Sequence, residues 1–253
     1  MPVLALANQK GGTAKTTSTA HLGAALAEAG KRVLLGDLDP QGHLAAAFGI
    51  HPQELVREMS SVLLGRCSLV QARLEGIRVG LDLVPANLHL ADLVYALASR
   101  PGRDLVLKKA LEKVTGQYDW VLLDCPPSLG VLTLNAVVAA DGILVPMNTE
   151  YSSMLGVADL LQMVEAVRSL VNPDIKIWGI IPTMLRRTVH SREVMEYVQR
   201  DLGSQGIRIY PAVPDSTRFK EAFALGKTVF ETDPELPGAV AYRRIAKELI
   251  HAY

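Results

Sequence analysis

Residues 3–17 read VLALANQKGGTAKTT, and this stretch decides the fold. Its first five residues, Val3–Ala7, form a short apolar run that is typical of a strand buried on both faces. From Thr16 to Ala29 the pattern is helical, and Gly30 stands where a helix commonly ends. A strand joined to a helix by a glycine-containing loop makes a cradle for anions, because backbone N–H groups and the positive end of the helix converge there.

The loop carries the residue types that the phosphates of ATP and Mg²⁺ require. Gly11 and Gly12 let the backbone approach a phosphate without a Cβ clash. Lys15 is placed to reach the β- and γ-phosphates, and the Thr16 hydroxyl is placed to ligate Mg²⁺. We therefore assign nucleotide binding to Gly11, Gly12, Thr13, Ala14, Lys15, Thr16 and Thr17.

The loop departs from the general pattern G-x-x-x-x-G-K-[ST] at two positions. Gln9 stands in place of the first glycine, and Ala14 precedes the lysine where a glycine is usual. The variant pattern x-K-G-G-x-x-K-[ST] is matched completely, because Lys10 supplies its additional lysine. With alanine at position 14, we expect helical backbone there rather than a positive φ.

Two further apolar runs lead to carboxylates. Val33–Leu35 is followed by Asp37 and Asp39, and Trp120–Leu123 runs directly into Asp124. An aspartate after a buried strand beside a phosphate loop holds Mg²⁺, usually through water. We therefore assign Asp39 and Asp124 to the metal site together with the loop threonine, and a loop cap is the structural alternative for each carboxylate.

Short apolar runs and helical stretches alternate along the rest of the chain. This alternation predicts an α/β fold with a doubly wound, mostly parallel sheet flanked by helices, and with ligands at the carboxyl ends of the strands. No repeat or linker interrupts it, so we expect residues 1–253 to form a single P-loop ATPase domain. The other expected strands are Leu81–Pro85, Ile143–Pro146, Ile177–Ile181 and Ile207–Val213. The other expected helices are Leu105–Val114, Met154–Val171, Glu193–Leu202 and Glu235–His251.

The overall composition excludes a chain-wide basic field. The 253 residues include 26 basic and 26 acidic side chains, so any contact with DNA or an anionic membrane has to come from a local patch. The two cysteines, Cys67 and Cys125, lack metal-ligand spacing. The sequence shows neither a signal-peptide pattern nor an apolar run of the ~18 residues that span a bilayer, so we expect a cytoplasmic location.

Three blocks of sequence resemble the ParA/MinD group of deviant Walker A ATPases, and most of all the short ParA-type partition ATPases. They are Asn8–Thr17, the segment DLDPQG at Asp37–Gly42, and Tyr118–Tyr151. A fourth, weaker block is Pro214–Lys227, and the similarity extends over nearly the whole chain. The resemblance implies a homodimer formed with ATP, in which Lys10 crosses to the nucleotide of the other copy.

The same resemblance implies roles for the acidic residues and a reaction. Asp39 is expected to orient or activate the attacking water, and Asp124 to serve the metal, while Lys10 and Lys15 hold the phosphates. ATP is expected to be hydrolysed slowly to ADP and phosphate with Mg²⁺. A ParB-like protein or another cargo adaptor is the implied partner that stimulates hydrolysis.

The late part of the chain supplies the remaining candidates. Pro214 and Asp215, in the fourth block, are assigned to the nucleotide site. In the family, the ATP-bound dimer binds DNA nonspecifically through basic residues late in the chain. Asp215 stands where the family often has an arginine, so one phosphate contact is expected to be missing. The DNA-binding candidates are Arg187, Arg218, Lys220, Lys227, Arg243, Arg244 and Lys247, with Arg186 and Arg192 as further basic residues nearby; a solvated charged face is the structural alternative.

The implied function is an ATP-dependent switch that segregates or positions a chromosome, a plasmid or other cargo, and that is nucleoid-associated when ATP-bound. A MinD-like ATPase at a membrane surface is one alternative, because residues 240–250 are amphipathic and basic; with no separate tail and no Trp or Phe anchor there, a membrane partner is not expected. A metabolic enzyme on the same loop, such as an amidotransferase-linked synthetase or an iron–sulfur reductase, is the other. The cysteines disfavour the reductase, and no partner glutaminase domain is visible.

Overall fold

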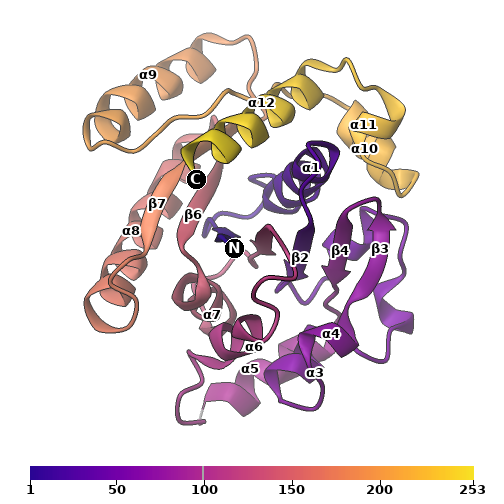
Figure 1. The fold of residues 1–253 in the computed structure, drawn as a ribbon. Coiled ribbons are helices and arrows are strands. Elements are labelled where there is room, and N and C mark those ends of the chain that lie inside the picture. The colour runs from indigo at the N-terminus through magenta and orange to yellow at the C-terminus, as the bar shows by residue number, and fades with distance from the viewer. Residues whose placement is uncertain (99) are drawn as a thin grey trace.

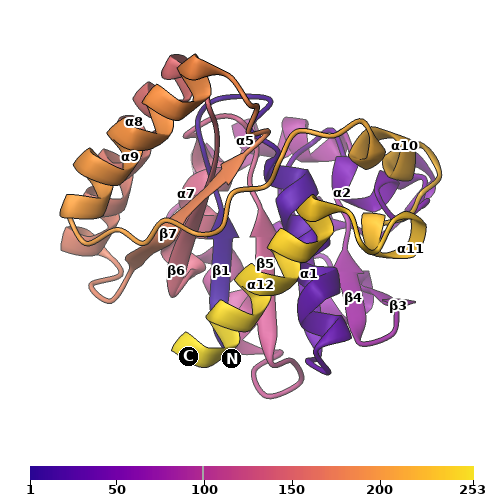
Figure 2. The same ribbon diagram turned by 90° about the horizontal axis from the view of Figure 1, so that it is seen from above.

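A seven-stranded sheet forms the centre of the molecule, with the strand order β3-β4-β2-β5-β1-β6-β7. The computed structural model describes residues 1–98 and 100–253. Helices cover both faces of the sheet (Figures 1 and 2). The strands are β1 Val3–Leu6, β2 Val33–Asp37, β3 Leu74–Arg78, β4 Leu81–Val84, β5 Trp120–Asp124, β6 Gly142–Asn148 and β7 Lys176–Thr183.

The pairing of the strands confirms the predicted doubly wound, mostly parallel sheet. All neighbouring strands pair in parallel except β3 and β4, which pair antiparallel. The sequence did not indicate β3, because its residues LEGIR mix charged and apolar side chains at a partly exposed edge. The expected strand Ile207–Val213 is wrong: this segment is no strand, although Ile209 forms an isolated bridge to Ile180 of β7 and the Val213 N–H donates to the Pro182 carbonyl. Pro211 lies within the segment and lacks the backbone N–H that a sheet ladder needs.

The expected helices are all present, with shifted ends. Gly30 follows α1 with a φ of 82°, and Pro237 lies in the first turn of α12, both as expected. Among the described residues, no helix is long and apolar enough to cross a membrane. The helices are α1 Lys15–Glu28, α2 His43–Ala46, α3 Met59–Leu63, α4 Leu69–Ala72, α5 His89–Ala98, α6 Val106–Glu112, α7 Val131–Ala139, α8 Tyr151–Leu170, α9 Val189–Ser204, α10 Arg218–Ala224, α11 Val229–Thr232 and α12 Pro237–Ala252, with a 3₁₀ turn at Pro52–Glu54.

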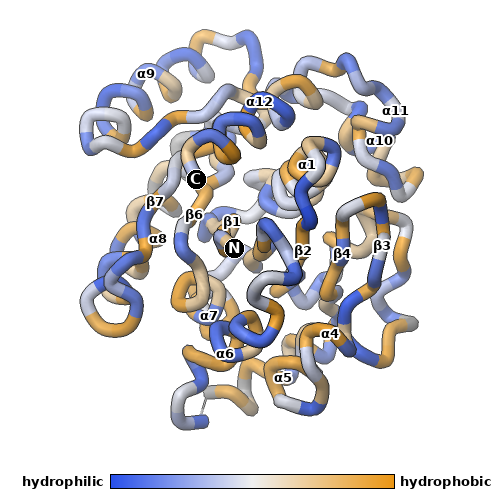
Figure 3. Tube along the Cα trace, viewed as in Figure 1, coloured by the Kyte–Doolittle hydropathy of each residue, from blue (hydrophilic) through white to orange (hydrophobic). Residues whose placement is uncertain are grey.

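The sheet separates two hydrophobic cores. Successive side chains of a strand point to opposite faces, so Leu34 of β2 joins the core beneath α3–α8 and Leu35 joins the core beneath α1 and α12. Since both faces are buried, the central strands are apolar without alternation. In Figure 3 the hydrophobic colours follow α1 and the central strands, whereas α9 is mostly hydrophilic.

Candidate active site

Three strands end together at one edge of the sheet. β5 lies between β1 and β2, and the register pairs Asp124 of β5 with Leu6 of β1 on one side and with Asp37 of β2 on the other. The loop at residues 7–14 leaves β1 at this edge and enters α1. The chain turns from one half of the sheet to the other here, which is where ligands bind in folds of this type.

The loop between β1 and α1 contains two residues in the left-handed conformation. Gly12 has a φ of 72°, and Ala14, immediately before α1, has a φ of 62° and a ψ of 32°. The expectation of helical backbone at Ala14 is therefore wrong. The loop keeps the turn that a glycine adopts freely, and the alanine Cβ costs about 1 kcal/mol in this conformation.

Polar side chains from neighbouring strand ends hold the loop in place. The Asn8 side chain accepts from the backbone N–H of Lys10 at 3.0 Å and donates to the Pro146 carbonyl of β6 at 2.9 Å. Thr183, at the end of β7, donates to the Thr13 carbonyl at 3.0 Å. Gly156 of α8 is needed at the contact, since a Cβ there would lie 2.8 Å from the Asn8 side-chain oxygen.

The two lysines of the loop occupy different environments. Lys15 is 7% exposed, and its ammonium donates to the Lys10 carbonyl at 3.1 Å. Burial lowers the pKa of Lys15, and the nearby Asp124 carboxylate acts in the opposite direction. Lys10 is half-buried, and its ammonium has no ion pair or hydrogen bond within the described part of the chain. Lys15 thus points into the site from within, whereas the Lys10 charge is unengaged.

Asp124 is fully buried and only half satisfied. One of its oxygens accepts from the Thr19 hydroxyl at 3.2 Å, and the other oxygen, Oδ2, has no hydrogen-bond partner. Burial raises the pKa of Asp124 to about 7; the nearby Asp39 carboxylate also raises it, and the nearby Thr16 and Thr19 hydroxyls lower it. A buried carboxylate oxygen without a donor is costly, so this atom marks a place for a cation or its water.

Asp37 and Asp39 shape the loop that follows β2. Asp37 is fully buried and accepts from the backbone N–H groups of Asp39 at 2.9 Å and Leu44 at 3.3 Å. Burial, with the Asp124 carboxylate alongside, raises the pKa of Asp37 well above its usual range. Asp39 is half-buried and accepts from the Gln41 backbone at 3.0 Å, which is a local turn contact and leaves its other oxygen available.

This donor set fits Mg²⁺ better than metals that need a full protein cage. Nowhere in residues 1–98 and 100–253 do three His, Cys, Asp or Glu side chains gather as metal ligands. Mg²⁺ keeps several waters and takes one or two protein oxygens beside substrate phosphates. The unpartnered Oδ2 of Asp124, next to the Thr16 hydroxyl, offers such oxygens.

A cavity of about 230 Å³ opens beside the loop and contains Pro214 and Asp215. Ala14 and Thr17 line it from the loop side, so the structure brings the late-chain residues to the predicted nucleotide site. A backbone bridge between Pro214 and Leu185 holds the late segment at the end of β7. Val213, Phe219 and Phe223 give the cavity an apolar wall, as a nucleotide base needs.

Comparison with known proteins agrees with this geometry. A family model described as an AAA domain matches residues 1–177. The chromosome partitioning protein ParA of Caulobacter vibrioides is 40% identical over 252 residues, which cover 98% of this chain and 93% of that protein. The chromosome-partitioning ATPase Soj of Thermus thermophilus is 41% identical over 98% of this chain and 94% of its own length.

The chain belongs to the ParA family of ATPases.

A solved structure extends the comparison to three dimensions. It is described as cobyrinic acid a,c-diamide synthase from Mycobacterium smegmatis with bound ATP analog and magnesium. It is 41% identical to this ATPase, with a TM-score of 0.85, and the match covers 99% of this chain and 95% of that one. The α/β fold with its mostly parallel sheet is thus shared along the whole length.

The structure adds residues to the site of this ATPase that the sequence analysis did not single out. Asn8 and Thr183 tether the loop, Thr19 binds Asp124, and Asp37 fixes the turn that carries Asp39. The available signal was position, because Asn8, Asp37 and Thr183 each end or directly follow an apolar strand run. Thr19 had no such signal, since it lies one helical turn inside α1.

His21 joins the late helices to the phosphate-loop helix. Its Nδ1 donates to the Thr17 carbonyl at 2.7 Å, and its Nε2 accepts from the Val229 backbone N–H of α11 at 3.1 Å. The ring also stacks on Tyr242 of α12. Burial lowers the pKa of His21 to about 4, so it is neutral and structural, as expected for a packed histidine.

The predicted DNA-binding residues divide into paired and unpaired groups. Arg218 pairs with Glu221 at 2.8 Å, Arg243 with Glu28 at 2.7 Å, and Arg244 with Glu248 at 3.2 Å. Arg186 is paired with Asp215 at 2.8 Å. Asp215, which stands where the family often has an arginine, therefore also neutralises the charge of Arg186. In the described residues, the candidates without an ion pair are Arg187, Lys220, Lys227 and Lys247.

One copy of the chain does not gather these basic residues into one patch. Lys220 and Lys227 line a hollow beside Thr16 and Thr17 at the loop end of the sheet. Arg244 and Lys247 instead line a hollow near the end of α12, where the terminal Tyr253 packs on Trp120 at the start of β5. Figure 2 shows α12 running from the α1 region toward the N-terminus.

The apolar face of α12 is already in use. Tyr242, Ile245 and Leu249 are fully buried in the core against α1, and the Tyr242 hydroxyl bonds Ser18 at 2.9 Å. Arg243 fixes the same contact through its pair with Glu28. A membrane-bound α12 would have to give up this packing, which favours the docked helix over a membrane anchor.

Proposed function

We propose that this chain is an ATP-dependent dimerising switch that binds DNA nonspecifically and positions a chromosome, plasmid or other cargo. The observation that carries the proposal is the contrast between the two loop lysines: Lys15 is buried against the loop, and the Lys10 charge is unengaged. A lysine beside a phosphate site with no partner in its own copy is suited to the nucleotide of a second copy. Residues 1–253 act in this proposal as one ATPase domain.

The site residues divide the work as follows. The backbone of residues 11–17 and the Lys15 ammonium hold the phosphates, while Pro214 and Asp215 enclose the base. Thr16 and Asp124 would hold Mg²⁺, with Asp39 beside them, and the ion would supply positive charge against the negative charge of the phosphates. Asp39 holds the attacking water, because one of its oxygens is free of the turn contact.

The basic residues give the switch its output. Two copies joined through ATP double each patch, so a chain with no net charge can present a basic stripe. We assign nonspecific backbone contacts first to the unpaired Arg187, Lys220, Lys227 and Lys247. Hydrolysis, stimulated by a ParB-like or other cargo adaptor, separates the copies and releases DNA. The protein is then cytoplasmic, and nucleoid-associated while ATP is bound.

The proposal is tested by DNA retention with no nucleotide, with ADP and with ATP, each over a salt series. We expect retention with ATP alone and a steep fall with salt, because phosphate contacts release counterions. Arg187→Ala should lower the slope of log affinity against log salt by about 1. Arg200→Ala, at an exposed arginine already paired with Asp201, is the matched control and should leave the slope unchanged. Equal binding with ADP and ATP contradicts the switch.

The synthetase alternative has one supporting observation, the description of the Mycobacterium smegmatis protein that is 41% identical. A synthetase of that description would convert carboxylic acid groups to amides and would have no need of DNA. ATP consumption that requires an added carboxylic acid substrate and an ammonia source, with no nucleotide-dependent DNA retention, would favour it over the switch.

A further inference from the structure

A second cavity lies on the other side of the sheet from α1 and α12. It has a volume of about 420 Å³ and is formed by α3, α4, α6 and the segment before α6. Figure 1 shows these helices grouped at one side of the molecule. None of the residues assigned to the nucleotide, the metal or DNA lines it.

The charges in this cavity are all of one sign. Arg66, Arg100, Lys109 and Lys113 line it, and its described lining contains no carboxylate. Arg100 donates to the Leu63 carbonyl at 3.4 Å, and in the described chain the other three make no ion pair. All four side chains are exposed at the mouth of the cavity, where like charges repel one another. In a chain with no net charge, this local concentration of basic side chains is suited to an anion from outside.

The acidic side chain that acts on Cys67 is already occupied. The Glu58 carboxylate contributes to the raised pKa of Cys67, after the larger effect of burial. Glu58 is only 2% exposed, however, and it caps α3 by accepting from the Ser60 backbone N–H at 2.6 Å. Ser68 and Gln71, which also line the cavity, satisfy each other in a capping box. The lining therefore has no internal partner left for its cations.

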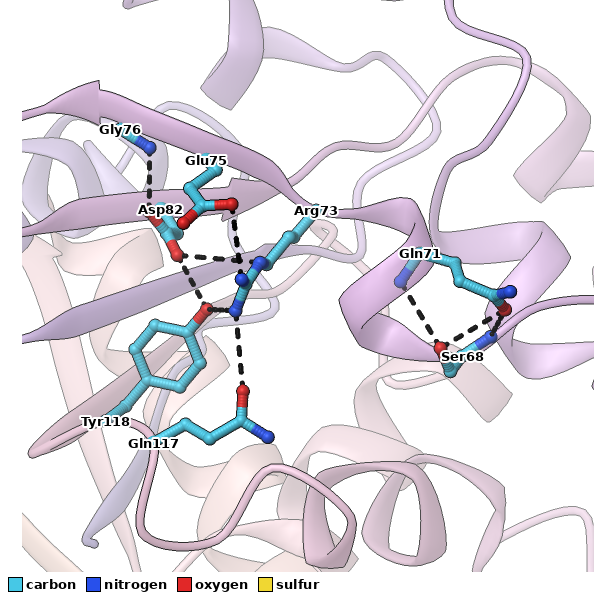
Figure 4. A network of polar contacts seen from close by, with 8 residues as sticks. All are labelled: Ser68, Gln71, Arg73, Glu75, Gly76, Asp82, Gln117 and Tyr118. Atoms are coloured by element: carbon cyan, nitrogen blue, oxygen red, sulfur yellow. Dashed lines mark hydrogen bonds and ion pairs between the residues drawn. The ribbon is translucent and has the colours of Figure 1, made fainter.

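An arginine next to the cavity shows what internal neutralisation looks like. Arg73 follows α4 and contacts Glu75 at 3.3 Å, Asp82 at 3.9 Å and the Tyr118 hydroxyl at 3.0 Å (Figure 4). The Ser68–Gln71 capping box appears beside it in the same view. The fold supplies carboxylates where an arginine stabilises the structure, and it supplies none to the cavity.

We infer that this basic cavity binds a small organic molecule that carries two or more phosphate groups. The volume lies within the ~300–1,000 Å³ of small-molecule sites. Val62, Leu69 and Val106 give it an apolar wall for a base or another organic part, while the arginines offer paired donors to phosphate oxygens. A concave site of this size suits a compact polyanion, whereas duplex DNA needs basic side chains spread along its phosphate backbone.

Cys67 reports on this site directly. It lines the cavity and is half-buried, whereas the only other cysteine, Cys125, is 1% exposed. A thiol reagent therefore labels Cys67 selectively. The probe is adenosine 3′,5′-bisphosphate, whose separated phosphates do not match a loop that holds a contiguous phosphate chain. Labelling rates are compared with and without the probe, at ionic strength matched with potassium chloride.

The expected result is saturable protection of Cys67 by the probe. The double variant Lys109→Glu with Lys113→Glu should weaken the protecting affinity by at least about tenfold. Lys108 lies on α6 but outside the lining of the cavity. In Lys108→Glu, the probe should therefore protect Cys67 as it does in the unchanged protein. The double variant Lys109→Gln with Lys113→Gln removes the two positive charges without adding negative ones. Its unfolding, followed by circular dichroism, shows whether weaker protection comes from lost charge or from a damaged fold. Absence of saturable protection, equal protection in the double variant and Lys108→Glu, or protection by duplex DNA in place of the probe would overturn the inference.

Discussion

Two aspartates on strands of the same sheet are treated in opposite ways. Asp82 of β4 has both oxygens occupied: one accepts from the Gly76 backbone at 2.8 Å, and the other accepts from the Tyr118 hydroxyl at 2.7 Å. Asp124 of β5 is more deeply buried, yet its Oδ2 has no partner. Asp124, whose burial costs more free energy, therefore has the less complete set of hydrogen bonds.

The difference separates stability from function. Around Asp82, burial and the acceptor raise the pKa of Tyr118 to about 12, so the hydroxyl remains a donor and the network stays closed. Around Asp124, three carboxylates and a buried lysine converge, and burial raises the pKa of two of the carboxyl groups. Polar groups left incomplete at a strand end are typical of a site that a ligand completes, at a cost in stability of the free protein.

Replacing the incomplete aspartate should remove activity without weakening the fold. We expect Asp124→Asn to lower ATP turnover by about 10²-fold, because a ligand to the metal is lost. The free energy of unfolding without Mg²⁺ should stay level or rise, since a buried carboxylate without a donor is removed. Turnover assays and urea titration measure both. If Asp124→Asn lowered the free energy of unfolding by more than removal of the Asp82 carboxylate does, the assignment of Asp124 to function and Asp82 to stability would be contradicted.

The pH dependence of stability should carry the mark of the same carboxyl. Because the pKa of Asp124 in the fold is raised to about 7, the native state holds a proton that the unfolded state releases near its ordinary value of about 4. Stability from this group is therefore present at low pH and falls as pH rises toward 7, by up to about 1.4 kcal/mol per unit.

The difference between the unchanged protein and Asp124→Asn measures this effect together with the part of the raised Asp37 pKa that the Asp124 carboxylate causes, and both act in the same direction. Both proteins carry His21, whose lowered pKa of about 4 acts in the opposite direction by losing stability as pH falls below about 6.5. Urea titrations without Mg²⁺ from pH 5 to 8 should show the difference in unfolding free energy falling with pH and then levelling. A difference that rises with pH would contradict the assignment.

Replacing Asp82, whose hydrogen bonds are complete, should weaken the fold and leave ATP turnover unchanged. Asp82→Ala removes acceptors for the Gly76 backbone and the Tyr118 hydroxyl, so we expect the free energy of unfolding to fall by about 1–3 kcal/mol with ATP turnover unchanged. Glu75→Ala is the control, because this carboxylate is 75% exposed and its pair with Arg73 contributes little. A drop in ATP turnover with no change in the free energy of unfolding would show that Asp82 serves the active site and not the stability of the fold.

The smallest effect is expected in the phosphate loop itself. Ala14 holds a left-handed backbone with a φ of 62°, which glycine adopts without strain. We expect Ala14→Gly to change the free energy of unfolding by no more than about +1 kcal/mol, since relief of strain is partly offset by a more flexible unfolded chain. Thermal unfolding beside Ala29→Gly, at a position with a φ of −80°, provides the comparison. Marked destabilisation by Ala14→Gly would show that the Cβ makes a required contact.

The sequence predicted the parts of this molecule that depend on local pattern. The apolar runs ending in Asp37 and Asp124 and the glycine loop at Lys10–Thr17 appear where their order indicates, because buried parallel strands have a distinctive composition. β3 was missed because a partly exposed edge strand lacks that composition, whereas Ile207–Val213 has it but forms only an isolated bridge and no continuous strand. The backbone of Ala14 could not be inferred from residue type, because contacts such as the one between Thr183 and the Thr13 carbonyl fix the loop from a distance.

The most direct test of the proposed dimer site mixes two inactive variants. Lys15→Ala should lose nucleotide binding in its own copy but still present Lys10, whereas Lys10→Ala should bind nucleotide but lack the lysine for its partner. Each alone is expected to be inactive with Mg²⁺ and ATP. An equal mixture should recover about a quarter of the unmodified turnover, because random pairing completes one site in half of the dimers. No recovery on mixing, or full activity of Lys10→Ala alone, would contradict a site completed by the second copy.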